Sequence, residues 1–464
     1  MTPLPSADAL RLHLAALERG LLERGCAVRL VLLAALAREH VLLIGPPGTA
    51  KSELARRLHR SFDGARYFER LLTRFSTPEE LFGPLSLKGL EEDRYERLID
   101  GYLPTAGIAF LDEVFKANSA ILNALLTLFN EREFDNGAGR ISAPLVCAIG
   151  ASNEPPGDES LQAFHDRFLV RVPVQPVGDD SFAALLQLGA PEADDWPQPI
   201  TGAELQALAA ARDRVAIGAE ALAALADLRA HAAEQQLTVS DRRWRQLVGL
   251  MRTAAASEGR VQLDEVDLWL APYVVGHDAD AVPRLQDWLA RQLGAVAQPL
   301  TGLGHAVQAF EKQLEVEQSL PAEDGSDDDA GKLALARAIA GPDAGGGEVG
   351  MMRVVSRTLE EQMQRRFSPV HVAARLAQLD DLAARVESVR AEAAAALAAL
   401  QVRLDGRLWL PPELAARWCG AHQRTLAVAQ GLAARLAATR EGFAALRVDD
   451  TLPAAEPAPL VLEA

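Results

Sequence analysis

The sequence predicts an α/β domain with a mostly parallel sheet, followed by an all-helical domain and a C-terminal helical bundle. Short apolar runs alternate with helical patterns as far as about residue 178, which is typical of an α/β unit. Beyond that point the apolar positions recur at helical spacing alone. Two long Ala-rich helical stretches then occupy about 371–404 and 413–448.

Composition fits a folded chain of several domains. At roughly 150 residues per domain, 464 residues suggest about three domains. The apolar share of 49% and charged share of 24% exclude a collagenous or mainly disordered chain. The net charge of -17 disfavours general binding to nucleic acid or anionic lipid. Cys26, Cys147 and Cys419 lie far apart, which argues against a disulfide framework or a zinc site.

The opening of the chain reads as a helix rather than a signal peptide. Asp8, Arg11 and Glu18 interrupt its apolar positions, and the pattern continues at helical spacing to about residue 38. No apolar run reaches the roughly 20 residues that a membrane-spanning helix needs. We therefore expect a soluble, cytoplasmic protein.

The predicted elements follow in a regular order. Continuous apolar runs predict the strands, and a helix over 119–132 lies between two of them. We expect the α/β domain over 1–178 and a helical domain over 179–298. The predicted strands are 41–45, 67–73, 108–114, 145–153 and 168–174, and the main helices of the second domain are 203–215, 220–235, 242–259 and 280–294.

The C-terminal third predicts a discontinuous bundle over 299–320 and 369–449. Leu379, Val386, Ala393 and Leu400 recur every seven residues, which favours a helical hairpin packed on a helix at 302–319 over a partner-binding coiled coil. The acidic, Gly-rich segment 321–368 is expected to be a flexible insertion. The tail 450–464 is expected to fray.

The loop after the first strand has the pattern of a phosphate-binding loop. Such a loop needs unobstructed backbone N–H groups, a Lys for the β and γ phosphates and a hydroxyl for Mg²⁺. Lys51 and Ser52 occupy those two positions. Ala50 stands where a Gly is usual, so we expect right-handed helical backbone angles there. The loop consists of Gly45, Pro46, Pro47, Gly48, Thr49, Ala50, Lys51 and Ser52.

An acidic pair ends the strand predicted at 108–114. Asp112 could hold Mg²⁺ together with Ser52, and Glu113 could polarise an attacking water. Neighbouring residues of an extended strand point to opposite sides, which would separate these two roles. The alternative is an acidic pair that caps a helix at the exit of the strand.

Other polar residues follow later strands. Asn153 could hydrogen-bond a γ phosphate and a water, or simply form a turn before Pro155. Arg167 and Arg171 could stabilise phosphoryl charge in a neighbouring subunit, or pair with surface acids such as Asp166. Two cations in the first turn of a helix suggest an anion to meet there; these are Arg242 and Arg243.

Together these motifs resemble the MoxR branch of the AAA+ ATPases, and RavA-type members in particular. GPPGTAKS resembles the Walker A motif of that branch, in which Ala before the Lys is habitual, and IAFLDEVFKAN resembles its Walker B region. ELFGPLSLKGL with RYERLIDGYLPTA is similar to the insertion before Walker B. The resemblance covers about residues 7–275 and implies an AAA+ P-loop NTPase domain with an all-α lid.

The resemblance also implies roles for single residues. Asn153 would be sensor 1, Arg167 the arginine finger that acts on a neighbouring subunit, and Arg242 sensor 2. Arg171 and Arg243 remain alternatives for the last two roles. The loop NEREFDNGAGRIS would be a hairpin directed at a ring pore. RavA-type proteins carry a small β-rich domain inserted in a three-helix domain, and 321–368 is too short for more than a reduced version.

The function implied is a Mg²⁺-dependent ATPase, assembled as a hexameric ring, that remodels or matures a protein partner. The resemblance implies a partner with a von Willebrand factor A (vWA) domain, and a chaperone-like or cofactor-insertion role. A nucleic-acid motor is the second hypothesis, although the predicted hairpin has Arg132 and Arg140 against three acids, including Asp135. A third is a nucleotide-gated scaffold with little turnover.

Overall fold

The computed structural model describes residues 3–137, 139–156, 161–189, 196–278, 280–293, 300–319, 366–454 and 456–458. The chain separates into two compact units. The first unit comprises 1–293 and 403–417, and the second comprises 294–402 and 418–464. The sequence grouped all of 369–449 in one bundle, whereas in the structure residues 403–417 group with the first unit.

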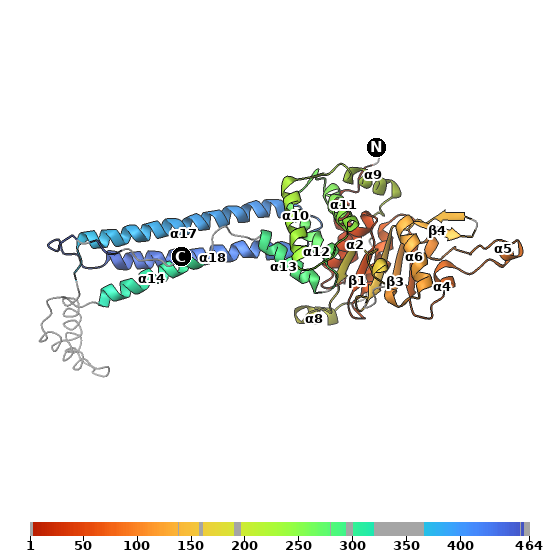
Figure 1. Cartoon of the computed structure of the whole chain (residues 1–464), viewed down its shortest axis with the longest axis horizontal. Helices are drawn as coiled ribbons and strands as arrows, with labels where there is room; N and C mark the ends of the chain where they lie inside the picture. The colour runs from red at the N-terminus through yellow and green to blue at the C-terminus, as the bar shows by residue number, and fades with distance from the viewer. Residues whose placement is uncertain are drawn as a thin grey trace, which may run out of the picture. The chain divides into compact units, whose positions relative to one another are not determined.

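A parallel sheet organises the first unit (Figure 1). Its strand order is β2-β3-β6-β1-β7, so β1 lies between two strands that come much later in the chain. The register aligns Val41 of β1 with Ile149 of β6 and with Val170 of β7. The strands are β1 (Val41–Ile44), β2 (Tyr67–Leu71), β3 (Ile108–Asp112), β6 (Cys147–Ser152) and β7 (Val170–Pro173).

Both faces of this sheet are buried, as parallel sheets require. Leu42 and Ile44 pack into a core with Leu125 of α6, while Val41 and Leu43 point to the other face and are equally buried. The short apolar runs in the sequence predicted these strands correctly to within a few residues. The helices and 3-10 turns (η) that surround them are α1 (Ala7–Glu18), α2 (Gly25–Leu36), α3 (Lys51–Leu58), η1 (His59–Ser61), η2 (Leu103–Thr105), η3 (Val114–Lys116), α6 (Ser119–Glu131) and α7 (Gln162–His165).

An insertion and a hairpin lie beside the sheet. The insertion contains α4 (Pro78–Phe82) and α5 (Leu87–Glu91), and the antiparallel hairpin pairs β4 (Glu133–Asn136) with β5 (Gly139–Ser142). The Asn136 side chain accepts from Arg97 N at 2.7 Å and donates to Arg97 O at 3.2 Å. A Cβ on Gly137 would lie 1.6 Å from Tyr95 O, so only Gly allows this approach. The hairpin turn is thereby fastened to the insertion.

The helical part of the first unit includes a buried segment that the sequence pattern did not separate. Asp264 caps η5 (Glu265–Leu270) through its side chain, and α12 (Ala271–Val275) follows directly. From Val266 to Val275 this stretch is buried on every side, so its apolar residues show no helical period. The other elements are α8 (Asp179–Leu186), α9 (Gly202–Arg212), α10 (Ala219–Glu234), α11 (Asp241–Ser257), α13 (Ala281–Leu293) and a short parallel pair of β8 (Ala216–Ile217) with β9 (Gln262–Leu263).

The second unit is a helical bundle formed by α14 (Leu300–Ser319), α17 (Pro369–Leu404) and α18 (Pro412–Ala444). The end of α17, from Arg403, and the start of α18, as far as Arg417, belong to the first unit. Phe310, Val386 and Leu436 share one apolar core, so the predicted hairpin does pack on the predicted third helix (Figure 1). The predicted insertion 321–368 lies outside the described residues, apart from 366–368, and so does 459–464 of the tail.

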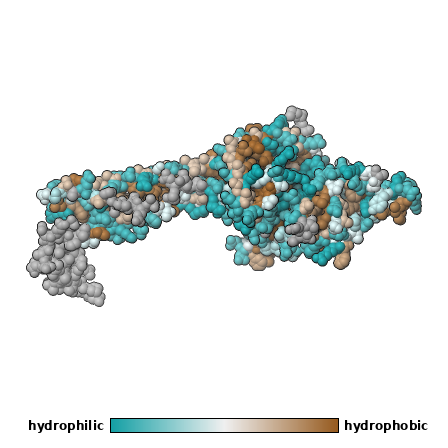
Figure 2. Space-filling view, viewed as in Figure 1, coloured by the Kyte–Doolittle hydropathy of each residue, from teal (hydrophilic) through white to brown (hydrophobic). Residues whose placement is uncertain are grey.

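The described surface is largely hydrophilic, with scattered hydrophobic patches (Figure 2). Within the described residues, no helix is long and apolar enough to span a bilayer.

Candidate functional site

The loop between β1 and α3 lies at the carboxyl edge of the sheet, where open α/β sheets bind ligands. Gly45 N donates to Ser152 O at 3.0 Å, and a Cβ on Gly45 would lie 1.9 Å from Val174 O. Gly45 is therefore required by the close approach of the segment after β7. Pro47 and Gly48 are exposed at the tip of the loop, and Thr49 is buried.

Lys51, the first residue of α3, folds back over the loop. Its Nζ donates to Gly45 O and Pro46 O, each at 2.8 Å. Burial lowers the pKa of Lys51, and the charges of Asp112 and Glu113 oppose that effect. A buried ammonium that is held by neutral carbonyls, with two carboxylates close by, can exchange those carbonyls for an anionic ligand.

Ala50 differs from the expectation of right-handed backbone angles. Its φ is 63° and its ψ 25°, which is the left-handed region that favours Gly. The loop must reverse its direction immediately before α3 begins, and this conformation achieves the reversal. For an L-residue it costs roughly 1–2 kcal/mol, so the loop carries backbone strain at the start of the helix.

Arg24 belongs to the site, although no sequence pattern pointed to it. Its guanidinium donates to Thr49 O at 3.1 Å and to Gln175 O at 2.7 Å, and burial lowers the pKa of Arg24. Arg24 thus ties the loop to the segment after β7. It also lines a cavity of about 240 Å³ beside the loop, together with Cys26, Val174, Tyr273, Val282 and Gln286.

The carboxylates of Asp112 and Glu113 point in different directions, but strand alternation, which the sequence predicted as the cause, is not the reason. β3 ends at Asp112, and Glu113 adopts left-handed angles with φ 50° and ψ 45°. A sharp turn, rather than strand alternation, therefore directs the two carboxylates apart. Asn153 Nδ2 donates to Glu113 Oε1 at 2.7 Å, and Lys116 Nζ lies 3.3 Å from the same oxygen. The structure thus brings Lys51, Asp112, Glu113 and Asn153 to one edge of the sheet.

The residues predicted to bind Mg²⁺ provide suitable oxygen ligands. Ser52 follows Lys51 at the start of α3, and Asp112 is close enough to influence the Lys51 ammonium electrostatically. Hydroxyl and carboxylate oxygens are the ligands that Mg²⁺ accepts, usually with waters and phosphates completing its shell. The described residues contain no cluster of three or more His, Cys, Asp or Glu that could hold a metal, so any Mg²⁺ here would depend on such a shared shell.

Two of the four candidate arginines are enclosed. Arg171 is buried in β7, donates to Gly276 O at 3.1 Å, and has a pKa that burial lowers to about 8. Arg243 is only 2% exposed and donates to Phe168 O, Leu169 O and the Asp166 carboxylate. The anion that Arg243 meets in the first turn of α11 is therefore a carboxylate of the chain itself.

Arg167 and Arg242 lie near each other and are more accessible. Burial lowers the pKa of Arg167, and the neighbouring positive charge of Arg242 lowers it further. Arg242 is exposed and donates to Asn130 Oδ1 at 3.2 Å. Two like charges held together on a surface favour a negatively charged group between them. In the described structure Arg242 donates to Asn130, and the acid whose charge acts on Arg167 is Asp166.

The two cations of the hairpin region are already engaged by the chain. Arg132 donates to the backbone carbonyls of Leu145 and Arg38. Arg140 pairs with Glu131, Glu133 and Asp135. Phosphate contacts need accessible cations, so this hairpin offers little to a nucleic acid.

Comparisons with known proteins agree with this geometry. A family profile described as the MoxR domain in the MoxR-vWA-beta-propeller ternary systems matches residues 8–210, and an AAA lid domain profile matches 220–289. The uncharacterized protein MJ0079 of Methanocaldococcus jannaschii is 40% identical over 56% of this chain and 68% of its own length. MJ0812 of the same organism is 41% identical over 56% and 69%, respectively.

A crystal structure of a candidate ATPase from Cytophaga hutchinsonii covers 61% of this chain and 92% of its own, with 15% identity and a TM-score of 0.49. The sheet order, the loop after β1 and the acidic end of β3 define an α/β nucleotide-binding domain of the AAA+ class, with a helical lid. Within that class, the chain belongs to the MoxR family of AAA+ ATPases.

Proposed function

We propose that this protein is a Mg²⁺-dependent ATP hydrolase that forms a ring and uses hydrolysis to remodel or mature a protein partner. The observation that carries the proposal is the convergence of Lys51, Asp112, Glu113 and Asn153 at the carboxyl edge of the sheet. A buried Lys beside two carboxylates and an amide is the set of groups that phosphoryl transfer to water requires.

Each group has a distinct task in the proposed reaction. Lys51 exchanges Gly45 O and Pro46 O for the β and γ phosphates of ATP. Ser52 and Asp112 would hold Mg²⁺, which would supply neutralisation of the charge on the phosphates. Glu113 accepts a proton from the attacking water, and Asn153, whose amide already reaches Glu113, orients that water.

The 240 Å³ cavity beside the loop is proposed to receive the base of the nucleotide. Arg24 links its wall to Thr49 O of the loop, which keeps the cavity and the phosphate site at a fixed separation. Tyr273 also lines the cavity, and its hydroxyl contacts Cys26 Sγ at 3.0 Å and Gln286 Nε2 at 2.7 Å. A nucleotide base in this cavity would therefore contact both the region of the loop and the lid segment that carries Tyr273.

Arg167 and Arg242 are proposed to act on the nucleotide of a neighbouring subunit. Their proximity to each other, and their contacts away from Lys51, suit a shared site between two copies of the chain better than the site of their own copy. Arg171 and Arg243 are less suitable, because both are buried and hold backbone carbonyls. A closed ring of six copies would complete every site in this way.

The protein partner is proposed to contain a vWA domain, as the description of the matching family suggests, and a β-propeller protein is a further candidate. A surface for such a partner lies on the insertion, where Leu87, Tyr95 and Leu98 are exposed, and on nearby Phe75, which is 90% exposed. Figure 2 shows hydrophobic residues at the α5 end of the unit. The contact between Gly137 and Tyr95 would let the hairpin and this surface move together.

The test is steady-state ATP hydrolysis across protein concentration, with oligomer mass measured on the same samples. Wild type should gain turnover per chain as rings form. Glu113→Gln should assemble with ATP but lose turnover by about 100-fold or more, because water activation contributes 10²–10⁴. Arg167→Ala should lose the dependence on concentration, while Arg66→Ala, at an exposed pair with Asp100, should not. ATP binding without turnover in wild type would instead support the scaffold hypothesis.

A further inference from the structure

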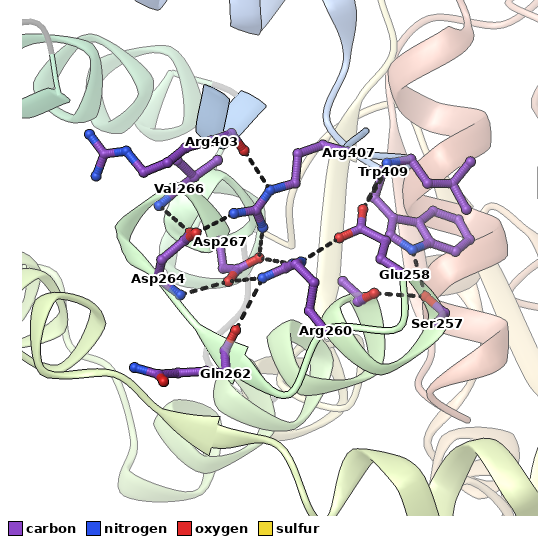
Figure 3. Close-up of polar contacts among 12 residues, drawn as sticks. Ser257, Glu258, Arg260, Gln262, Asp264, Val266, Asp267, Arg403, Arg407 and Trp409 are labelled. Carbon is purple, nitrogen blue, oxygen red and sulfur yellow. Dashed lines mark hydrogen bonds and ion pairs between the residues drawn. The ribbon is translucent and has the colours of Figure 1, made fainter. Parts of the chain in front are cut away.

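The turn between α17 and α18 inserts the side chains of Arg407 and Trp409 into the helical part of the first unit (Figure 3). Arg407 donates to Asp267 Oδ1 at 2.8 Å and to the Asp264 carboxylate, while its Nε holds Arg403 O at 2.9 Å. Arg403 pairs with Glu265. We call residues 403–410 the tip and the residues that it contacts between 257 and 267 its seat.

The seat carries more negative than positive charge without the tip. Asp267 is only 2% exposed and receives both Arg260, at 2.5 Å, and Arg407. The charges of Asp267 and Glu258 more than offset the burial of Arg260 and raise the pKa of that guanidinium. Glu258, Asp264 and Asp267 would share Arg260 if Arg407 were removed. A buried carboxylate that loses its cation is strongly disfavoured, so the seat depends on the tip for its conformation.

Backbone and aromatic contacts fix the tip in place. Glu258 Oε1 accepts from Leu408 N at 2.8 Å and from Trp409 N at 3.3 Å. The indole Nε1 of Trp409 donates to Ser257 Oγ at 2.8 Å, and the ring is 1% exposed (Figure 3). The tip is therefore held by directional bonds on several sides, as a part that must keep one position would be.

The seat leads directly to the nucleotide cavity. η5 begins after Asp264 and continues without a break into α12, which carries Tyr273. Trp269 and Tyr273 meet edge to face with centroids 6.2 Å apart, and Tyr273 lines the cavity beside Arg24. From Val266 to Val275 the chain is buried throughout, so a shift at Asp267 has little room to relax before it reaches Tyr273.

We propose that Arg407 is a positioning residue for nucleotide binding. By balancing Asp264 and Asp267 it fixes the 264–276 segment, and through that segment it fixes the wall of the cavity that Tyr273 forms. This inference rests on the proposed function, because it assigns the cavity to the base of ATP. Its consequence is that the turn joining the two long helices of the bundle controls nucleotide affinity beside the loop around Lys51, which lies far earlier in the sequence.

The test measures the affinity of the full chain for fluorescently labelled ADP, together with KM and kcat for ATP. Arg407→Gln should weaken ADP binding about 3- to 10-fold and raise KM, with kcat little changed, since coupling of this kind is moderate. Arg407→Lys should give an intermediate loss, because an ammonium cannot span both carboxylates as a guanidinium does. The control Arg390→Gln removes an exposed pair with Glu387 and should leave affinity unchanged.

A rescue separates positioning from general destabilisation. Adding Asp264→Asn to Arg407→Gln removes one acid along with the cation, so affinity should recover even if the melting temperature does not. By reciprocity, ADP should slow hydrogen exchange at 403–410 in wild type, which needs no variant to fold. Unchanged affinity in a folded Arg407→Gln, or unchanged exchange at the tip, overturns the inference. Wild type that binds no nucleotide overturns the proposed function as well.

Discussion

The loop around Lys51 and the seat of the tip are two buried charge clusters in the same unit, and they satisfy their charges differently. At the seat, Arg260 and Arg407 both contact the Asp267 carboxylate directly. At the loop, Lys51 Nζ contacts two backbone carbonyls, while Asp112 and Glu113 act on it from farther away. At the seat, cations of the chain itself neutralise the buried carboxylates, so we call this cluster closed. At the loop, Lys51 can still exchange its carbonyl partners for a negatively charged ligand.

This difference separates a structural cluster from a binding cluster. Removing one member of a closed buried pair leaves its partner uncompensated, so the cost falls on folding. Removing a cation that donates only to neutral oxygens costs folding much less, because those oxygens can accept from water or neighbouring groups instead. We therefore expect mutations at the seat to change stability first, and mutations at the loop to change ligand affinity first.

The largest expected effect on stability is at Asp267. Asp267→Asn keeps the shape of the side chain but removes the charge between Arg260 and Arg407, and should reduce the free energy of unfolding by about 3 kcal/mol. Chemical denaturation of the full chain measures this. Asp100→Asn, at an exposed pair with Arg66, should cost less than about 1 kcal/mol. Equal losses of unfolding free energy at the two positions would show that Asp267 does not depend on its two arginines more than an exposed carboxylate depends on its partner.

The largest expected effect on binding is at Lys51. Lys51→Ala should weaken ATP binding about 100-fold, because a charged donor to phosphate contributes roughly 1.5–3 kcal/mol per bond, while unfolding changes little. Calorimetric titration with ATP, beside a melting curve, tests both halves of this statement. The exposed Lys88→Ala serves as the control. A large loss of stability at Lys51 would remove the contrast with Asp267.

Sequence spacing predicted the binding cluster better than the closed one, for a physical reason. Lys51, Ser52 and the Asp112–Glu113 pair each follow a strand within a few residues, so local pattern and the common edge of a parallel sheet bring them together. Arg24 and Arg407 contact groups 25 and 140 positions away, and no local period records such contacts. The same limit explains why 403–417 was assigned to the bundle rather than to the first unit.

Backbone conformation at the site is the second feature that the sequence did not predict. Neither the left-handed angles of Ala50 nor those of Glu113 followed from residue type, since both residues disfavour that region. The turn after β3 and the turn before α3 are imposed by the sheet and the helix on either side of them. Strain held by its surroundings in this way is common at functional sites, and it can be measured at Ala50.

Relief of that strain gives a smaller expected effect. Ala50→Gly should raise the free energy of unfolding by roughly 0.5–1 kcal/mol, because relief of 1–2 kcal/mol of left-handed strain exceeds the added freedom of Gly in the unfolded chain. The matched control is Ala55→Gly, which lies within α3 and should destabilise by about 1 kcal/mol or more. Denaturation curves of the two variants should therefore move in opposite directions. Destabilisation by both would mean that Ala50 is not strained.

The last expected effect depends on pH and concerns Glu39, a partly buried carboxyl that belongs to neither cluster. Burial raises the pKa of Glu39 to about 7, although Arg132, Arg242 and Arg212 favour its charged form, and Gln246 Nε2 donates to it at 3.0 Å. A pKa raised above the ordinary value of 4.5 means that the folded state holds the proton more tightly. The stability it contributes is therefore fully present below pH 4.5 and is lost as the pH rises through about 7.

Glu39→Gln keeps the shape of the side chain and cannot ionise, so it should match wild type near pH 5 and exceed it near pH 8. The side chain is partly exposed, which limits the expected difference to about 1 kcal/mol. Melting temperatures of both proteins across that range measure it, with Glu91→Gln at an exposed position as the control. A stability difference between the two proteins that is constant with pH would mean that the three arginines outweigh burial. Glu39 would then resemble the carboxylates of the seat, which stay charged because cations of the chain neutralise them.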